Sequence, residues 1–300
     1  MPTKRLLNSI AAHKKTAITM IIGLIAGPIV GVLLNDCIAV TPARLTRLLE
    51  NGDVEGFNNL RAQFKQQISF ERIDLSNKNL SGVNLDSVIL LHSNLFNTNL
   101  EDSSLENAQI SGNLTSINLK NANFPKAHLV GASLRDGDLT DASLDNATLT
   151  NAEFSGGTLT NAFLTGANLR NADLDNDTLT TARIVNTTLA NASLADADLS
   201  DSYLRNNDLT NANLYDADLS DASLVNTTLA NASLADADLS DEYIVRDNLT
   251  NVDMNLTNLR ETKFDCESVR TVTTNFAVNA NQFHIVEINN GSIKEISSCQ

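Results

Sequence analysis

The chain has 300 residues, of which only 4% are aromatic, with no Trp and four Pro, and its formal net charge at pH 7 is −15. This composition argues against the aromatic-rich core of an ordinary globular enzyme and is typical of a repeat array. The acidic balance disfavours binding to nucleic acid or anionic membrane surfaces and favours cations or basic partners.

The N-terminal region, residues 1–40, differs in character from the rest of the chain. Residues 16–35 carry no charged side chain, and as a helix they would span roughly the 30 Å of a bilayer core. Basic residues precede this stretch, so the positive-inside rule predicts a single membrane span with the N-terminus cytoplasmic and the remaining chain extracytoplasmic. The alternative is a signal peptide cleaved near Cys37, which predicts a secreted or periplasmic protein. Three glycines with small-xxx-small spacing would let two such helices pack as a homodimer: Gly23, Gly27 and Gly31.

Residues 41–69 are predicted to form a helical N-terminal cap. Thr41 can cap a first helix that has Pro42 at its first position, and Asn51-Gly52 ends it. Asp53 can cap a second helix. The apolar side of that helix would carry Phe57, Leu60 and Phe64. A short apolar helical pair directly before a repeat array is most simply a lid over its first coil.

Residues 70–269 carry an apolar residue at every fifth position. One series runs from Leu75 to Ile110; one residue is then missing, and a second series runs from Leu114 to Val269, giving 40 central positions in all. A small residue, most often Ala or Gly, precedes each centre by two positions. A period of five fits neither a helix nor a strand, so the chain must turn at every repeat.

Strings such as "ANLRNADLDN" and "ADLSDASLVN" resemble the pentapeptide-repeat family, whose tandem motif is A(D/N)LXX. The resemblance covers about two-thirds of the chain. It implies an all-β fold, a right-handed quadrilateral β-helix in which each pentad makes one side. The central Leu and the small residue two positions before it would point inward, and the other three residues would face solvent.

A period of 20 residues is visible without the family. Asparagine recurs at this spacing at Asn151, Asn171, Asn191, Asn211, Asn231 and Asn251. The segment 185–201 also repeats letter for letter at 225–241, two such periods later. Coils of 20 residues stacked at strand spacing, about 4.8 Å, would give a solenoid of ten coils about 50 Å long.

The array is predicted to be irregular at one place and to end near residue 269. The missing residue between Ile110 and Leu114 is interpreted as a local bend. Residues 270–300 are predicted to be a C-terminal hairpin cap, since "FHIVEINNGSIKEI" contains Asn290-Gly291, which suits a type I′ turn. Two cysteines, Cys266 and Cys299, either pair as a disulfide in an oxidising compartment or remain free thiols.

Catalytic motifs are not recognisable in the sequence. The four histidines share no metal-ligand spacing, and no nucleophile–base arrangement or glycine-rich phosphate loop occurs. The chain is therefore predicted not to be an enzyme and to need no cofactor.

Aspartates repeat at 20-residue spacing in three columns. In the coil fold that the resemblance implies, all three columns border a single side of the solenoid. The columns are Asp196, Asp216 and Asp236; Asp198, Asp218 and Asp238; and Asp201, Asp221 and Asp241. They are interpreted either as a solvated, solubilising face or as a strip that binds divalent cations such as calcium, or a basic partner, through carboxylate oxygens. Two outward tyrosines beside this strip, Tyr203 and Tyr243, are interpreted either as anchors for such a partner or as isolated exposed aromatic residues.

Three functions compete at this stage. The first is a non-catalytic, membrane-anchored or exported scaffold that presents its acidic face to a protein partner. The sequence does not identify that partner or its pathway. The second is DNA mimicry: some pentapeptide-repeat proteins resemble duplex DNA in size and charge and act on DNA gyrase. An extracytoplasmic repeat domain departs from those members, because gyrase would lie on the other side of the membrane. The third, an enzyme with an unrecognised site, has no sequence feature in its favour.

Overall fold

The computed structural model describes residues 41–64, 67–271, 283–289 and 292–296. Its first elements are two helices, α3 (Pro42–Glu50) and α4 (Val54–Arg61). Asp53 caps α4, since its carboxylate accepts a hydrogen bond of 2.8 Å from the backbone N–H of Gly56. The two predicted helix starts are confirmed. The helical region is shorter than predicted, because a tight turn from the N–H of Phe64 to the carbonyl of Arg61 ends it.

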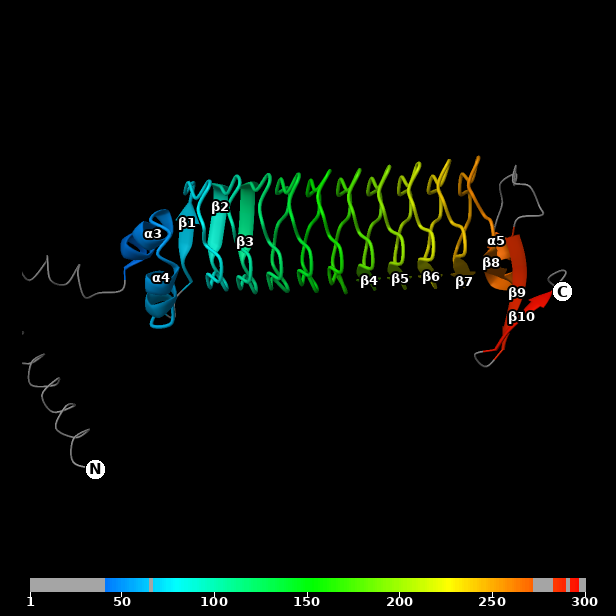
Figure 1. The fold of residues 1–300 in the computed structure, drawn as a ribbon, viewed down its shortest axis with the longest axis horizontal. Coiled ribbons are helices and arrows are strands. Elements are labelled where there is room, and N and C mark those ends of the chain that lie inside the picture. Colours follow the sequence, from blue (N-terminus) through cyan, green and yellow to red (C-terminus); the bar gives the residue numbers. More distant parts are fainter. Residues whose placement is uncertain (1–40, 65–66, 272–282, 290–291, 297–300) are drawn as a thin grey trace, which may run out of the picture. The chain divides into compact units, whose positions relative to one another are not determined.

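From Phe70 the chain winds into a parallel β-solenoid of about ten coils, which Figure 1 shows as successive loops of similar outline. Backbone bridges join residues 20 apart, as between Asp138 and Thr158, so one coil is four pentads. All central residues from Leu75 to Phe264 are buried. Burial of each central residue contributes roughly 2 kcal/mol to folding. A single coil is not stable on this burial alone, so the remaining stability must come from the stacking of coils on one another.

Each coil has four sides, which we call A, B, C and D. In the coil that begins at Leu129 their central residues are Leu129, Leu134, Leu139 and Leu144. Side A carries the first sheet: β1 (Ser69–Glu71), β2 (Ile89–Asn94) and β3 (Gln109–Asn113). Side D carries the parallel strands of the second sheet: β4 (Arg183–Val185), β5 (Tyr203–Arg205), β6 (Ser223–Val225), β7 (Tyr243–Val245) and β8 (Thr262–Asp265). Strands β4 to β7 lie in adjacent coils in Figure 1.

The corners between sides need left-handed backbone. The residue two positions after most central residues has a φ near +57°, as at Asn171 (φ 56) and Asp216 (φ 54). Asn, Asp and Gly adopt this conformation at the lowest cost, which explains why these residue types recur at the corners. The predicted asparagine column lies at one corner, where the Asn171 amide donates to Asn151 Oδ1 at 3.0 Å. The same contact recurs from Asn211 to Asn191 at 2.9 Å.

The missing residue between Ile110 and Leu114 produces a local irregularity, as predicted. The pairing of β2 with β3 shifts by one residue between Leu90 and Ser93, and later coils continue in register. Gly112 sits at φ 124, and a Cβ there would lie 2.2 Å from the carbonyl oxygen of Ser93. Only glycine fits this close approach.

The array ends one pentad earlier than predicted. A short helix, α5 (Cys266–Thr271), replaces the last pentad, and Val269 is not buried. The Asp265 carboxylate accepts a hydrogen bond of 2.8 Å from the N–H of Ser268 and so starts the helix. An antiparallel pair, β9 (Phe283–Asn289) and β10 (Ser292–Ile296), follows, with β9 parallel to β8. The predicted hairpin is confirmed as the closing element of the second sheet.

No helix within the described ranges is long and apolar enough to cross a membrane. The predicted span, residues 16–35, and its three glycines lie outside the described residues. The membrane anchor, the signal peptide and the homodimer contact therefore stay predictions.

Candidate functional site

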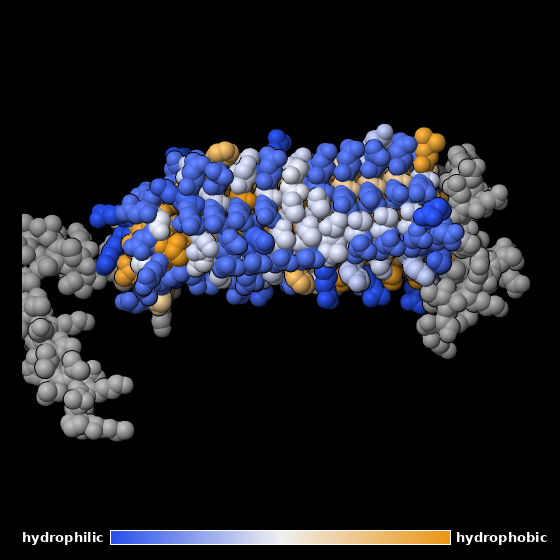
Figure 2. All heavy atoms as spheres, in the orientation of Figure 1, coloured by the Kyte–Doolittle hydropathy of each residue, from blue (hydrophilic) through white to orange (hydrophobic). Residues whose placement is uncertain are grey.

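The nine aspartates of the three predicted columns lie on side C and the two corners that border it. We call this set, Asp196 to Asp241, the acidic face. Asp198, Asp218 and Asp238 are bridged to one another by parallel backbone pairing, which places one directly above the next. Successive carboxylates in a column are therefore one strand spacing apart, about 4.8 Å. Figure 2 shows residues of similar polarity aligned in rows along the solenoid surface, with hydrophilic residues covering most of the visible side.

The aspartates of side C itself also serve the backbone. Asp198 Oδ1 accepts hydrogen bonds from both the N–H and the hydroxyl of Ser200, at 3.0 and 2.6 Å. Asp238 accepts the N–H of Ser240 at 2.8 Å and the amide of Asn258 at 2.8 Å. Although partial burial raises the pKa of Asp238, these hydrogen bonds outweigh it and hold the pKa below its ordinary value. This column has a structural role that does not depend on a ligand.

The other two columns of the acidic face lie at the corners. All six residues have positive φ, between 54° and 62°. Asn takes this conformation as well as Asp does. The backbone therefore explains why one of these two residue types occurs at the corners, but not why it is the negatively charged one. The charge is therefore the feature of the acidic face that the fold does not require.

The negative charge of the acidic face changes the pKa of a neighbouring tyrosine, Tyr215. This tyrosine is 46% exposed on side B, beside the corner that carries Asp196, Asp216 and Asp236. The negative charge of Asp236, with a hydrogen bond to the same carboxylate, raises the pKa of the Tyr215 phenol above its ordinary value. Sequence reasoning missed Tyr215, although its position one residue before Asp216 marks it as outward-facing.

Metal-ligand clusters are not found in the described part of the chain: no group of three or more His, Cys, Asp or Glu side chains there is arranged to hold an ion. Cys266 is disulfide-bonded. Its predicted partner, Cys299, lies outside the described residues, so that pairing stays a prediction.

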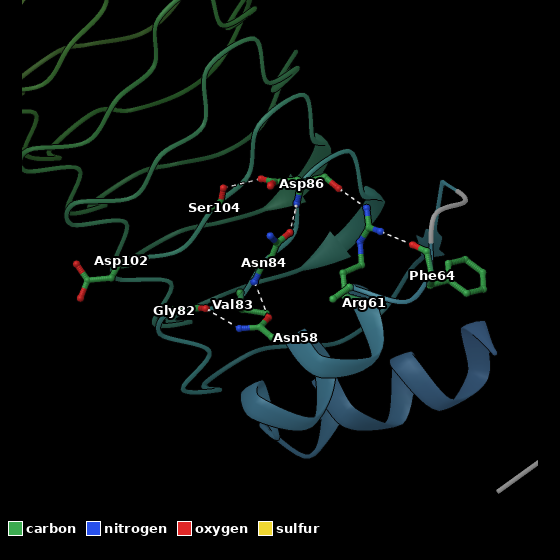
Figure 3. A pocket seen from close by; sticks show the side chains of 10 residues that line it. Asn58, Arg61, Phe64, Gly82, Val83, Asn84, Asp86, Asp102 and Ser104 are labelled. Carbon is green, nitrogen blue, oxygen red and sulfur yellow. Dashed lines mark hydrogen bonds between the residues drawn. The ribbon is translucent and has the colours of Figure 1, made fainter. Parts of the chain in front are cut away.

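A cavity of about 530 Å³ lies between α4 and the first coils (Figure 3). Arg61 crosses it and donates to the carbonyls of Phe64 and Asp86 at 2.6 and 2.7 Å. The Asn58 amide donates to the carbonyl of Gly82 at 2.9 Å. The Phe57 ring lies 6.5 Å from that of Phe70, between centroids. These contacts hold α4 against the first coils, at the place where the sequence predicts a lid.

Three carboxyls are buried inside the solenoid: Asp177, Glu242 and Asp247. Each occupies the inward position that Ala or Gly usually fills. Each uses one oxygen to accept a backbone N–H, from Gly157 for Asp177 at 2.6 Å and from Thr227 for Asp247 at 2.5 Å. The second oxygen of each finds no hydrogen-bond partner among the described residues.

Burial disfavours the charged form of these three groups. It raises the pKa of Asp177 to about 8, that of Asp247 to about 8 and that of Glu242 to about 9. At neutral pH they are therefore mostly protonated and can act as hydrogen-bond donors. Sequence reasoning missed them, although the departure from Ala or Gly at their positions was a usable signal.

The family model for pentapeptide repeats matches the chain in eight copies. The matched residues are 66–102, 113–151, 147–183, 182–221 and 212–241. No curated protein sequence matches the chain.

Solved structures of pentapeptide-repeat proteins resemble this chain. HetL from the cyanobacterium Nostoc sp. strain PCC 7120, described as involved in heterocyst differentiation regulation, is 29% identical, with 69% of this chain and 94% of HetL covered and a TM-score of 0.39. Trypsin-treated QnrB1, a plasmid-mediated fluoroquinolone resistance protein, is 16% identical, with 68% and 93% covered and a TM-score of 0.36.

A third structure, a pentapeptide-repeat protein from the thylakoid lumen of Arabidopsis thaliana, is 20% identical, with 32% of this chain and 68% of that protein covered and a TM-score of 0.22. Because all three TM-scores are below 0.5, no functional argument rests on these likenesses. The repeat matches, which cover more than half of the chain, and the 20-residue coils lead to one conclusion: the chain belongs to the pentapeptide-repeat family.

Proposed function

We propose that the protein is a non-catalytic β-helical scaffold that binds a basic protein partner through the acidic face. The observation that carries the proposal is the stacking of three aspartate columns over three consecutive coils. Like charges one strand spacing apart repel one another, by about 1 kcal/mol per pair in bulk water and more near a protein. A partner that brings Lys or Arg side chains to these columns relieves that repulsion.

The solenoid supports this role by rigidity. Both the corner backbone and the side-C turns of the acidic face are fixed by hydrogen bonds within and between coils, as at Asp198 and Asp218. A rigid, pre-arranged array of charge loses little conformational entropy on binding. Complementary charge also accelerates association and makes it sensitive to salt.

The chain offers a matched control for testing the acidic face. Asp136, Asp138 and Asp141 occupy the same three columns in an earlier coil, but the two coils that follow carry no aspartate in these columns. Neutralising this isolated set and neutralising the stacked set Asp216, Asp218 and Asp221 remove the same number of charges. Asn keeps the corner conformation and the turn hydrogen bonds in both variants.

The test is binding of a fluorescent oligolysine peptide, measured by anisotropy at low and moderate salt. We expect the variant D216N/D218N/D221N to weaken binding by about tenfold and the variant D136N/D138N/D141N to weaken it much less. Equal losses in the two variants would mean that the peptide senses only net charge, and the acidic face would not be a binding surface.

We further propose that residues 16–35 hold the scaffold at a membrane with the repeat domain extracytoplasmic. The uncharged length of this segment and the basic residues before it support the proposal. A reporter fused after Gln300 tests it: extracytoplasmic activity is expected. A cytoplasmic signal would reject this topology and would restore the alternative of a DNA mimic that acts on DNA gyrase.

A further inference from the structure

A groove of about 710 Å³ runs along side D and borders the acidic face at the corner column that continues as Asp201. Its lining residues come from five successive coils, from Asp141 to Val225. The outward residues that shape it include Phe163, Arg183, Val185, Tyr203, Arg205 and Val225. Phe163 is 44% exposed and Tyr203 is 56% exposed, which is unusual for large aromatic side chains in a chain with so few of them.

The two arginines of the groove have no side-chain partner among the residues that the structure describes. Neither Arg183 nor Arg205 makes an ion pair or a side-chain hydrogen bond with another described residue. The corner column that borders the groove is uncharged at Asn161 and Thr181, beside Phe163 and Arg183. It carries an aspartate at each end of this stretch, Asp141 in the lining and Asp201 in the coil of Tyr203. A protein with a net charge of −15 thus presents two unpaired cations among exposed aromatic and aliphatic side chains. This combination complements a ligand that is apolar and carries negative charge.

The spacing of the aromatic residues restricts the shape of that ligand. Backbone pairing places Phe163, Arg183 and Tyr203 on consecutive coils, so the two rings lie two coils apart. At the usual strand spacing this separation is about 10 Å. Tyr243 continues the series another two coils along, with the ammonium of Lys263 4.6 Å from its ring centroid.

A polyproline II helix has a matching repeat. It rises roughly 3.1 Å per residue with three residues per turn, or about 9 Å per turn. A β-strand presents same-side residues only about 7 Å apart, which does not match. Proline-rich segments in this conformation bind other proteins by laying prolines on exposed aromatic side chains, at low entropic cost.

We propose that the side-D groove binds a proline-rich, acidic polypeptide segment in the polyproline II conformation. Prolines on successive turns pack against Phe163 and Tyr203, and the aliphatic surface of Val185 and Val225 lies beside them. Acidic residues of the segment pair with Arg183 and Arg205. This proposal goes beyond the acidic face, which would take a basic partner, so the two proposals succeed or fail separately.

The test uses the full chain, kept in mild detergent because of its apolar segment 16–35, and a labelled synthetic peptide of repeated Pro-Pro-Glu. A flexible peptide of repeated Gly-Ser-Glu has the same charge but no preformed helix, and a Pro-Pro-Lys peptide has the same shape but opposite charge. We expect the Pro-Pro-Glu peptide to bind at least about tenfold more tightly than either control peptide. Equal binding of the Pro-Pro-Glu and Gly-Ser-Glu peptides would overturn the proposal.

Variants locate the binding site. F163A/Y203A should weaken binding of the Pro-Pro-Glu peptide by about tenfold or more. F96A removes an equally exposed aromatic ring, 41% exposed on side B, and should leave binding unchanged. R183Q/R205Q should weaken binding and reduce its dependence on salt. Thermal melts confirm that each variant folds. A loss in F96A equal to that in F163A/Y203A would place binding elsewhere and reject the groove.

Two other occupants give distinct results. Sedimentation velocity without peptide would reveal self-association; if F163A/Y203A abolished it and the peptide did not compete, the groove would be a contact between two copies of this chain. If polygalacturonate bound at the groove and the Pro-Pro-Glu peptide did not, the ligand would be an anionic polysaccharide. Either result would overturn the proposal of a proline-rich partner.

Discussion

The coils with inward positions 122 to 172, here called the earlier coils, and those from Asp177 onward, the later coils, share one backbone but have different interiors. From Ala122 to Ala172, every inward position that precedes a centre by two residues is Ala or Gly. From Asp177 onward the same position also holds Thr, Ser, Asn, Asp and Glu, and these side chains are buried. The backbone pairing is the same in both regions, since the earlier and the later coils both pair with a 20-residue offset.

A repeated hydrogen bond explains how the later coils tolerate polar side chains. The Thr187 hydroxyl donates to the carbonyl of Leu164 at 2.6 Å, and the Thr227 hydroxyl donates to the carbonyl of Leu204 at 3.0 Å. The Asn207 amide donates to the carbonyl of Ile184 at 2.8 Å. In each case the acceptor lies 23 residues earlier. At these three positions the buried polar group is stabilised because it donates a hydrogen bond to the backbone.

Asp247 follows Thr187, Asn207 and Thr227 in the same column of side A. A carboxyl can donate only when it is protonated. The comparison between earlier and later coils thus predicts that pH matters to the later coils and not to the interior of the earlier ones.

The largest expected effect comes from removing all three buried carboxyls at once, in the variant D177N/E242Q/D247N. Folding raises each pKa, so between about pH 4 and about pH 8 the folded protein retains protons that the unfolded chain has released. Stability therefore falls as pH rises through this window, by up to about 1.4 kcal/mol per pH unit for each group.

We expect urea unfolding between about pH 5 and about pH 7 to show a steeper loss of stability in the natural chain than in this variant, by up to about 4 kcal/mol per pH unit. Asn and Gln keep the size of the side chains and supply a permanent donor. Parallel pH profiles for the two proteins would show that the three carboxyls are not protonated in the folded state.

The second effect transfers a carboxyl from the later coils to the earlier ones. Ala147 lies at the side-A inward position and is buried. We expect A147D to lower the free energy of unfolding by about 3 kcal/mol at neutral pH, from overpacking and from burial of a polar group, and by less at acidic pH.

The matched control for this transfer is A147N, which adds similar volume without a titratable group. Its cost should not change with pH, as measured by urea unfolding at two pH values. An identical pH profile for A147D and A147N would contradict the link between burial and protonation.

A smaller loss is expected from N207A. The Asn207 side chain donates to Ile184 and accepts the N–H of Thr187 at 2.9 Å, and both contacts are buried. Removing them leaves two backbone groups unpaired, at a cost of about 2 kcal/mol. N168A, at an outward position of the earlier coils, removes only an exposed hydrogen bond from the N–H of Arg170, at 3.1 Å, and should cost less than about 1 kcal/mol. Thermal melts of both variants measure the difference, and equal shifts would mean that the interior hydrogen bonds add nothing.

The smallest effect should be the same in both regions, because it concerns the corners. Gly166 and Asn206 occupy equivalent corners at φ 72 and φ 57. We expect G166A and N206A each to cost about 1 kcal/mol in the free energy of unfolding, since Ala disfavours the left-handed conformation. At Gly166 a Cβ would also lie 2.6 Å from Asn146 Oδ1, whose side chain must move. N206A and N206G both lose the amide hydrogen bonds of Asn206 with Asn186 and Asn226, at 3.2 and 2.9 Å, so N206G should cost less than N206A by the backbone term alone. Equal costs for N206G and N206A would contradict this explanation.

The five-residue period was sufficient to predict the coils, because it records burial directly: the central positions to Phe264 are all inside. The same period wrongly placed Val269, since the backbone leaves the solenoid where Glu267 would have to point inward and α5 forms instead. Tyr203 and Tyr243 were recognised as outward-facing, but their association with Phe163 and two arginines required the register of side D. The protonation of Asp247 needed the depth of burial, which a sequence pattern does not measure.

The 20-residue coil also makes the length of the scaffold adjustable. Deleting residues 185–224, or inserting a further copy of them, changes the solenoid by two whole coils, or about 10 Å. Every column keeps its side, because the end of one coil is equivalent to the end of the next. The distance between the α4 lid and the closing hairpin can thus evolve in steps of whole coils. The surface that each coil presents does not change when coils are added or removed.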